Sequence, residues 1–202
     1  MIRTFHPLES QGALHPLRLG RFTASAGNSL FMKESTAGYQ DTIKKVAYER
    51  FTGKPADTGF TGNYWTNRGH ELEYLAVECY EIDTFSTVTD GGFWTCGDWW
   101  GASPDGLIEP DGLFEGKAPK FTTHMGYLAK GVLPSTYKWQ PHFQMLCTDR
   151  NWVDFQSFDL ELPPFRIRVH RDEKKEAELI KALQLAQEQA ESIIKDMEKY
   201  SA

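Results

Sequence analysis

The chain has 202 residues, enough for one domain with a sizeable core, and its 40% hydrophobic and 25% charged residues are typical of a soluble globular protein. Its net charge of −6 argues against a protein that coats nucleic acid through a basic surface, but it allows an enzyme whose metal ions supply local positive potential. No apolar run approaches the ~20 residues of a membrane span, and three scattered cysteines indicate neither disulfides nor a cysteine metal site. We therefore expect a cytoplasmic protein without a membrane partner.

The first part of the chain combines breakers of regular structure with one candidate anion site. Residues 1–22 contain several Pro and Gly and are expected to be irregular. A short helix should then run to Phe31, with Thr23 or Ser25 as its N-cap. Its free N–H groups, the Ser25 hydroxyl and the nearby Arg18 would suit a phosphate. On these residues alone the simpler interpretation is favoured, in which Ser25 only caps the helix and Arg18 is only solvated.

Two helices are predicted next, separated by a Gly-rich aromatic loop at 54–66 that either touches a ligand or folds back on the core. The first helix covers residues 38–52, and Gly53 ends it. Its expected buried stripe is Ile43, Val46, Ala47 and Phe51, and its expected outer residues are Lys44, Lys45 and Glu49. The second helix runs from about 66 to about 80, and Glu73 falls in line with its apolar stripe. A carboxylate there needs a cation or metal partner, although an exposed Glu73 at the helix edge is an equal alternative.

An antiparallel meander is expected between residues 85 and 118, followed by a loop over 119–135. Its strands are 85–89, 93–108 and 113–118, with turns at Asp90-Gly91-Gly92 and Pro110-Asp111-Gly112. A helix over 135–148 contains Pro141, which fits either a helix that begins at Trp139 or Gln140 or a kinked helix. Two further strands, at 151–159 and 166–170, precede a long amphipathic helix over 171–200. The pattern predicts one α+β domain over residues 1–202, with helices before and after a central sheet.

The segment from Ser103 to Lys117 carries the most chemistry. Pro104 and Gly106 place Asp105 in a turn. Glu115 and Lys117 are two residues apart in a strand, so they point to the same face. Two carboxylates and an amine at one place would hold a divalent cation beside a general base. Taken alone, Asp…Glu-x-Lys is common by chance and a surface hairpin is the simpler interpretation.

Four segments together resemble one family. Ser103-Pro104-Asp105-Gly106 with Glu115-Gly116-Lys117 resembles the PD-(D/E)xK nuclease motif, in the form found in phage lambda exonuclease, alkaline exonucleases and YqaJ-type viral recombinases. The segments 17–25, 69–73 and 137–140 resemble that family's phosphate-binding segment, its helix with a metal-associated glutamate, and its glutamine beside the metals. Their order and approximate spacing agree over most of the chain. The resemblance implies a restriction-endonuclease-like α+β fold, with a central mixed sheet flanked by helices and a long C-terminal helix.

The resemblance also implies roles for individual residues. Asp105, Glu115 and the Gly116 carbonyl would bind Mg²⁺, with two ions expected and Mn²⁺ as a substitute, and Glu73 would act through a water. Lys117 would activate or orient the attacking water with support from Gln140. The group that would hold the terminal 5′-phosphate of DNA is Arg18, Ser25 and Ser103.

The implied activity is processive 5′→3′ degradation of one strand of linear double-stranded DNA, which leaves 3′ overhangs for recombination by single-strand annealing. The implied partners are a single-strand annealing protein and two further copies of the chain in a homotrimer ring, in a bacterial host with phage or prophage genes. Three alternatives stay open. They are a PD-(D/E)xK endonuclease or repair nuclease, a catalytically silent DNA-binding module, and a two-carboxylate hydrolase of sugars, in which Lys117 would have no role.

Overall fold

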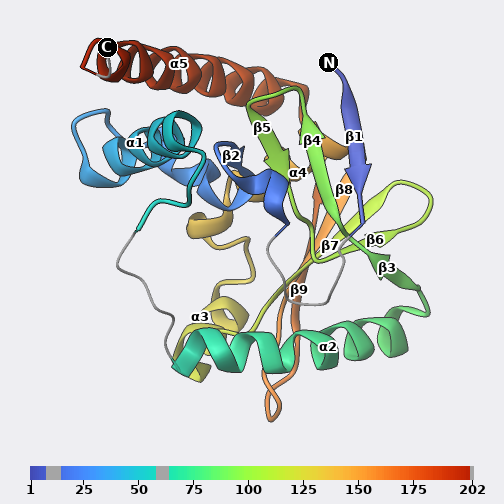
Figure 1. Cartoon of the computed structure of the whole chain (residues 1–202). Coiled ribbons are helices and arrows are strands. Elements are labelled where there is room, and N and C mark those ends of the chain that lie inside the picture. Colours follow the sequence, from blue (N-terminus) through green and yellow to red (C-terminus); the bar gives the residue numbers. More distant parts are fainter. Residues whose placement is uncertain (8–14, 58–63, 201–202) are drawn as a thin grey trace.

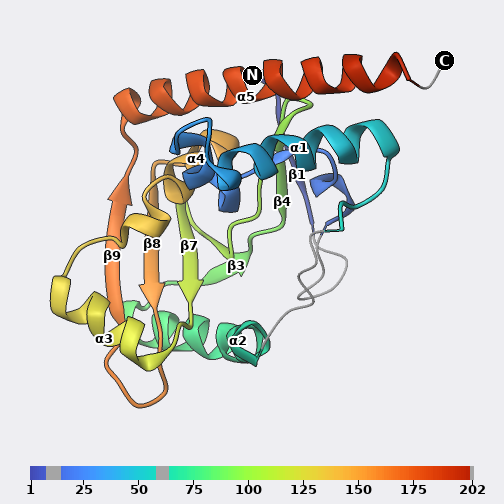
Figure 2. The ribbon, with the colours of Figure 1, turned by 90° about the vertical axis from the view of Figure 1, so that its left-hand side faces the viewer.

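The computed structural model describes residues 1–7, 15–57 and 64–200, and within 64–73 it describes among side chains only that of Leu72. Two sheets lie between helices (Figure 1). In Figure 2, α5 and α1 run above the sheets and α2 and α3 lie below them. The helices are α1 (Ala37–Thr52), α2 (Tyr64–Thr84), α3 (Phe121–Lys130), α4 (Gln140–Thr148) and α5 (Glu173–Glu198), with 3₁₀ segments η1 (Pro16–Arg18), η2 (Ala24–Phe31) and η3 (Ser135–Tyr137). The expected α+β class, with mixed sheets flanked by helices and a long C-terminal helix, is confirmed.

The larger sheet has the strand order β3-β6-β7-β8-β9. Its strands are β3 (Val88–Asp90), β6 (Gly106–Ile108), β7 (Gly112–Lys117), β8 (Trp152–Ser157) and β9 (Phe165–His170). β7 and β8 are parallel and the other neighbours are antiparallel. Parallel neighbours need a crossover connection, and here it contains α3, η3 and α4. The crossover therefore carries α4 back over β7.

A second sheet has the order β1-β4-β5-β2, formed by β1 (Arg3–His6), β4 (Phe93–Cys96), β5 (Trp100–Ala102) and β2 (Phe22–Thr23). The N-terminal segment was expected to be irregular, but Arg3–His6 pairs with β4. The predicted single meander is also wrong. β3 and β4 belong to different sheets, so Asp90-Gly91-Gly92 links the sheets instead of forming a hairpin turn. The single strand expected over 93–108 is three strands, of which β4 and β5 belong to the second sheet and β6 to the larger one.

The predicted helix at 38–52 is confirmed as α1, which Thr36 caps and Gly53 ends in the left-handed region (φ 65°). Two details of its predicted faces are wrong. Phe51 is exposed, and Glu49, expected outside, is only 6% exposed. Glu49 Oε2 accepts a hydrogen bond from the main-chain N–H of Gly20 at 2.9 Å. This bond explains the burial of Glu49, because a buried carboxylate needs donors.

The predicted loop at 119–135 contains helix α3, so that prediction is wrong. The helix is held to the sheet by His124, which is fully buried. The two ring nitrogens of His124 lie 2.7 Å from Ser157 Oγ and 2.9 Å from the main-chain oxygen of Pro163. The apolar residues Phe121 and Met125 of α3 are exposed. Phe121, Met125 and Leu128 have the spacing of one helix face, so the sequence carried a usable signal for α3. The polar His124 and not this face is what the helix buries against the sheet.

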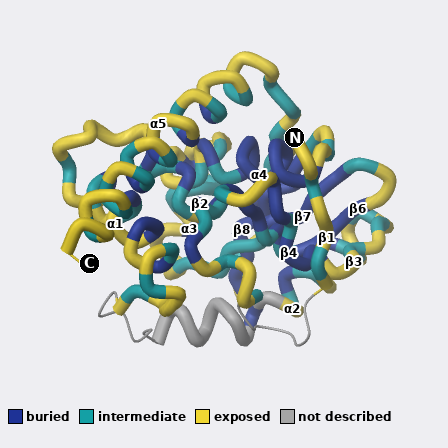
Figure 3. The backbone as a smooth tube through the Cα atoms, turned by 45° about the horizontal axis from the view of Figure 1, so that its top comes forward, coloured by how far each residue is buried: buried dark blue, intermediate teal, exposed yellow. Residues whose placement is uncertain are grey.

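Helix α4 begins at Gln140, with Pro141 in its first turn, where the missing N–H of proline costs least. The kinked alternative is therefore excluded. Residues 141–148 are all buried, and the buried segments of Figure 3 gather on α4, β4, β7 and β8. Above α4 lies α5, whose apolar stripe buries Leu179, Leu183, Ala186 and Ala190 completely against the main core.

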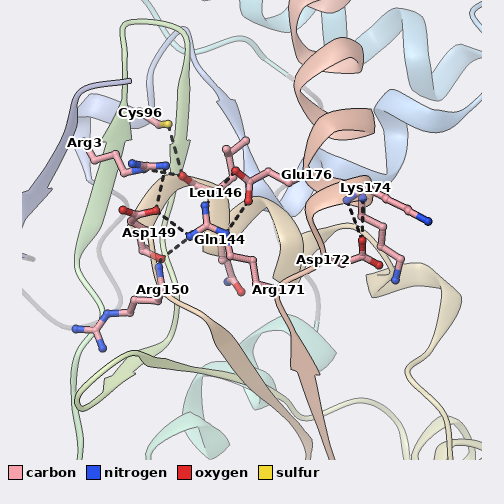
Figure 4. Close-up of polar contacts among 12 residues, drawn as sticks. Arg3, Cys96, Gln144, Leu146, Asp149, Arg150, Arg171, Asp172, Lys174 and Glu176 are labelled. Atoms are coloured by element: carbon pink, nitrogen blue, oxygen red, sulfur yellow. Dashed lines mark hydrogen bonds and ion pairs between the residues drawn. The ribbon is translucent and has the colours of Figure 1, made fainter.

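An ion-pair cluster fixes the C-terminal end of α4 (Figure 4). Asp149 follows the helix with φ 62°, and its Oδ1 accepts from Arg171 at 2.8 Å and lies 3.3 Å from the guanidinium of Arg3. Arg171 in turn donates to both oxygens of Glu176 on α5. The N-terminal strand, α4 and the start of α5 therefore meet at one carboxylate.

Candidate active site

The β6–β7 hairpin brings Asp105 beside the end of β7. The main-chain N–H of Asp105 donates to Phe114 O at 3.1 Å, and Asp105 Oδ2 accepts from the N–H of Gly116 at 2.8 Å. The link between the sheets passes behind this hairpin, because a Cβ on Gly91 would lie 2.0 Å from the main-chain oxygen of Pro104. Close packing of this kind holds the Asp105 carboxylate in place.

Glu115 and Lys117 share one face of β7, as their spacing predicts. Lys117 Nζ donates to Glu115 Oε1 and lies 3.8 Å from Asp105 Oδ2. The ammonium also lies 5.8 Å from the ring centre of Tyr137. The three residues predicted to form the centre of the site, Asp105, Glu115 and Lys117, are therefore together.

Helix α4 supplies two glutamines to Glu115. Gln140 Nε2 donates to Oε1 and Gln144 Nε2 donates to Oε2, both at 2.5 Å. Gln140 was predicted beside the metal site. Gln144 was not, although its position one helical turn after Gln140 was a usable signal, because residues four apart lie on the same side of a helix.

Burial and like charge set the electrostatics of the site. Burial of the Glu115 carboxylate, together with the charge of Asp105, raises the pKa of Glu115 to about 7, and Lys117 opposes this shift. Burial disfavours the charged Lys117, but the charges of Glu115 and Asp105 outweigh burial and raise the pKa of Lys117 above its usual value. Lys117 is thus an ammonium between two carboxylates.

The donor set fits a divalent cation. Carboxylate and main-chain carbonyl oxygens are the ligands that Mg²⁺ prefers. The Asp105 charge that raises the pKa of Glu115 is a repulsion between carboxylates, which a cation would relieve. In the described part of the chain, no three His, Cys, Asp or Glu side chains cluster at a metal-binding distance. The predicted further acid, Glu73, lies on α2 and outside the described side chains, so its role stays a prediction.

The predicted phosphate-binding residues lie around the same corner of the second sheet. Burial lowers the pKa of Arg18, and the negative charge of Glu115 partly opposes this shift. The Arg18 guanidinium therefore lies within electrostatic range of the Glu115 carboxylate. Arg18 Cζ lies 5.8 Å from the ring centre of Phe93, and Ser103 Oγ donates to Gly92 O at 2.9 Å. Residues 91–93 therefore connect Arg18 and Ser103.

Ser25 lies at the same end of the second sheet as Ser103. β2 and β5 are parallel with Thr23 opposite Gly101, so Ser25 and Ser103 each lie two residues beyond the same end of a strand pair. The capping interpretation of Ser25 is not supported. The segment is the 3₁₀ helix η2, its N-cap is Thr23, and Thr23 makes no side-chain capping bond. Ser25 is exposed, with its Oγ 3.3 Å from Thr23 Oγ1.

Most of the chain matches one known protein family. Residues 14–151 match the sequence profile of the YqaJ-like viral recombinase domain. The chain belongs to this family. A search of curated proteins finds no match to this YqaJ-like chain.

Solved structures agree with this YqaJ-like assignment. An alkaline exonuclease, LHK-Exo, from Laribacter hongkongensis is 32% identical and matches with a TM-score of 0.82 over 91% of this chain and 94% of its own. LHK-Exo in complex with dAMP matches at 0.84 with 32% identity over 92% and 95% of the two chains. A phage related exonuclease from Haemophilus somnus 129PT, 15% identical, matches at 0.69 over 88% and 96%, which shows a shared fold.

Proposed function

We propose that this chain is a Mg²⁺-dependent exonuclease that degrades one strand of linear double-stranded DNA in the 5′→3′ direction and leaves 3′ overhangs. The observation that carries the proposal is the convergence of Asp105, Glu115 and Lys117, with Gln140 on Glu115, in a chain of the YqaJ-like family. The similar alkaline exonuclease supports a nuclease, and its complex with dAMP supports a DNA substrate.

Asp105, Glu115 and the Gly116 carbonyl, with Glu73 through a water, would hold Mg²⁺, and we expect two ions and substitution by Mn²⁺. When bound, Mg²⁺ supplies positive charge to the phosphodiester and lowers the pKa of water. Lys117 then orients the attacking water by donating a hydrogen bond. We favour orientation over proton abstraction because the neighbouring carboxylates stabilise the charged ammonium.

The proposed preference for a DNA 5′ end rests on Arg18, Ser25 and Ser103. A guanidinium and two hydroxyls at Arg18, Ser25 and Ser103 suit the oxygens of a terminal 5′-phosphate, and charge-assisted bonds to phosphate are strong. Binding of the end beside the cleavage site would select linear DNA. We place this activity in phage-type recombination in the cytoplasm of a bacterial host, with a single-strand annealing protein as partner and a homotrimer ring around the DNA.

Digestion of matched DNA molecules tests the proposal. We expect linear 5′-phosphorylated duplex to be degraded with Mg²⁺, to be spared with a chelator, and closed circular duplex to resist. A 5′-hydroxyl end should be degraded more slowly, and Arg18→Ala should reduce this difference. Cutting of closed circles would instead select an endonuclease, and no digestion under any condition would select a silent DNA-binding module.

Two substitutions test the assigned chemistry. Lys117→Ala and Asp105→Ala should each lower the rate by about 100-fold or more, because each removes a group that acts on the reacting phosphate or its metal. Circular dichroism spectra like that of the wild type would show that both variants are folded. Digestion at the wild-type rate by either variant would contradict the site.

A further inference from the structure

Gln144 is the second glutamine that holds Glu115, and its side chain is fully buried. Lys117 and Gln140 both donate to Oε1 of Glu115, whereas Gln144 donates to Oε2 at 2.5 Å. Both oxygens of the carboxylate therefore accept hydrogen bonds. Oε1 faces Lys117 and Asp105, where the reaction is proposed, and Oε2 is held by Gln144.

Packing alone does not explain why residue 144 carries an amide oxygen. The Oε1 of Gln144 is buried and has no hydrogen-bond partner in the described part of the chain. An unpaired buried acceptor destabilises a fold, and an apolar side chain of similar length would avoid that cost. α4 is otherwise well suited to apolar residues here, since Phe143, Met145 and Leu146 beside it are buried. A residue needed only to fill this space would not be a glutamine.

We propose that Gln144 is a positioning residue that holds Oε2 of Glu115 so that Oε1 stays turned toward Lys117 and Asp105. This inference rests on the proposed function, in which Glu115 binds Mg²⁺. The terminal torsion of a glutamate has a broad, two-fold energy profile, so burial alone does not set the plane of the carboxylate. Donors on both oxygens do set it. Gln144 thus prepares Glu115 for the metal without touching the substrate.

Gln144→Met separates this role from packing, because Met has a similar length and no amide. Partners of a metal ligand typically contribute 10- to 100-fold to affinity. We expect the dissociation constant for Mn²⁺, measured without DNA by the loss of the free-ion electron paramagnetic resonance signal, to rise about 10- to 100-fold. The Mg²⁺ concentration for half-maximal digestion should rise in the same range. The melting temperature should change little, because loss of the unpaired acceptor offsets loss of the hydrogen bond to Glu115 Oε2.

Thr148→Val is the matched control. Thr148 is buried one turn later on the same helix and donates to the main-chain oxygen of Gln144 at 2.9 Å. Its loss should lower the melting temperature and leave Mn²⁺ binding unchanged. Gln144→Asn provides a second test, since its amide is one methylene too short to reach Oε2, and it should weaken Mn²⁺ binding as Gln144→Met does.

The outcomes separate this inference from the proposed function. A wild-type chain that binds Mn²⁺ and digests DNA, with both Gln144 variants indistinguishable from it in Mn²⁺ affinity and Mg²⁺ dependence, overturns the role of Gln144 alone. A wild-type chain that neither binds Mn²⁺ nor digests DNA overturns the proposed function and this inference with it.

Discussion

Glu49 and Glu115 are both buried carboxylates, and their different partners make only Glu115 a candidate for function. Glu49 accepts from the main-chain N–H of Gly20, so its charge is used to join two segments. Glu115 has three side-chain donors and a second carboxylate, Asp105, close enough to raise its pKa. Like charges brought together cost stability unless a cation joins them, and such sites are candidates for function.

His142 gives a pH prediction at the same scale. Burial, and then the neighbouring ammonium of Lys175, lower the pKa of His142 to about 4, with Lys138 acting in the same direction and Asp172 and Glu176 opposing. In the unfolded chain the pKa is about 6.5, so between these values the unfolded state binds a proton that the native state does not. The free energy of unfolding should therefore fall as pH is lowered from about 6.5 to about 4, by up to about 3 kcal/mol from this residue.

His142→Gln should flatten this part of the curve, since glutamine stays neutral throughout. Urea unfolding at a series of pH values measures the difference between the variant and the wild type. His170→Gln is the control, because His170 is exposed at the end of β9. An identical pH slope in wild type and His142→Gln would contradict the assignment.

At the scale of elements, the link between the two sheets positions the site. Trp94 Nε1 donates to Gly91 O at 3.0 Å and Ser103 Oγ donates to Gly92 O, so the link is tied to both β4 and the turn before Asp105. Gly91→Ala would place a Cβ 2.0 Å from Pro104 O, a contact that only a main-chain shift can relieve. We expect a loss of about 1–3 kcal/mol in the free energy of unfolding and a lower digestion rate.

Gly126→Ala in α3 is the control for Gly91→Ala, because a Cβ there meets nothing within 4 Å. It should leave digestion unchanged and add up to about 1 kcal/mol of stability, since alanine favours a helix over glycine. Thermal unfolding and digestion of linear DNA measure both variants. Equal behaviour of the two would show that the close approach at Gly91 has no role.

These elements also show how far sequence reasoning reaches. The apolar periods of α1 and α5 predicted these helices. A motif predicted Asp105, Glu115, Lys117 and Gln140, and its parts lie in the β6–β7 hairpin and the first turn of α4. The pairing of β3 and β4 with different sheets depends on contacts far apart in sequence. The burial of His124 and Gln144 likewise depends on partners that no local pattern contains. Local rules predicted local geometry, and tertiary partners decided the rest.

At the scale of the whole molecule, none of the described helices is long and apolar enough to span a membrane.

Exposed apolar residues bear on the proposed trimer. Phe121 and Met125 on α3 are 58% and 52% exposed, and they lie four residues apart on one side of that helix. Tyr74 and Ile82 on α2 are also exposed, and α2 and α3 lie together on the lower side of the molecule in Figures 1 and 2. Exposed apolar surface of this kind often marks a protein interface.

Met125→Glu tests whether this side forms the ring. A charge at a buried interface costs several kcal/mol, so we expect a trimer of three times the chain mass in wild type and smaller species in the variant, measured by sedimentation. Leu185→Glu on the exposed face of α5 is the control for the long helix, which otherwise covers the core. A ring should also keep degrading a labelled duplex after excess unlabelled duplex is added, and Met125→Glu should lose this property. A monomeric wild type would remove the ring. Dissociation by Leu185→Glu alone would place the interface on α5 and not on α2 and α3.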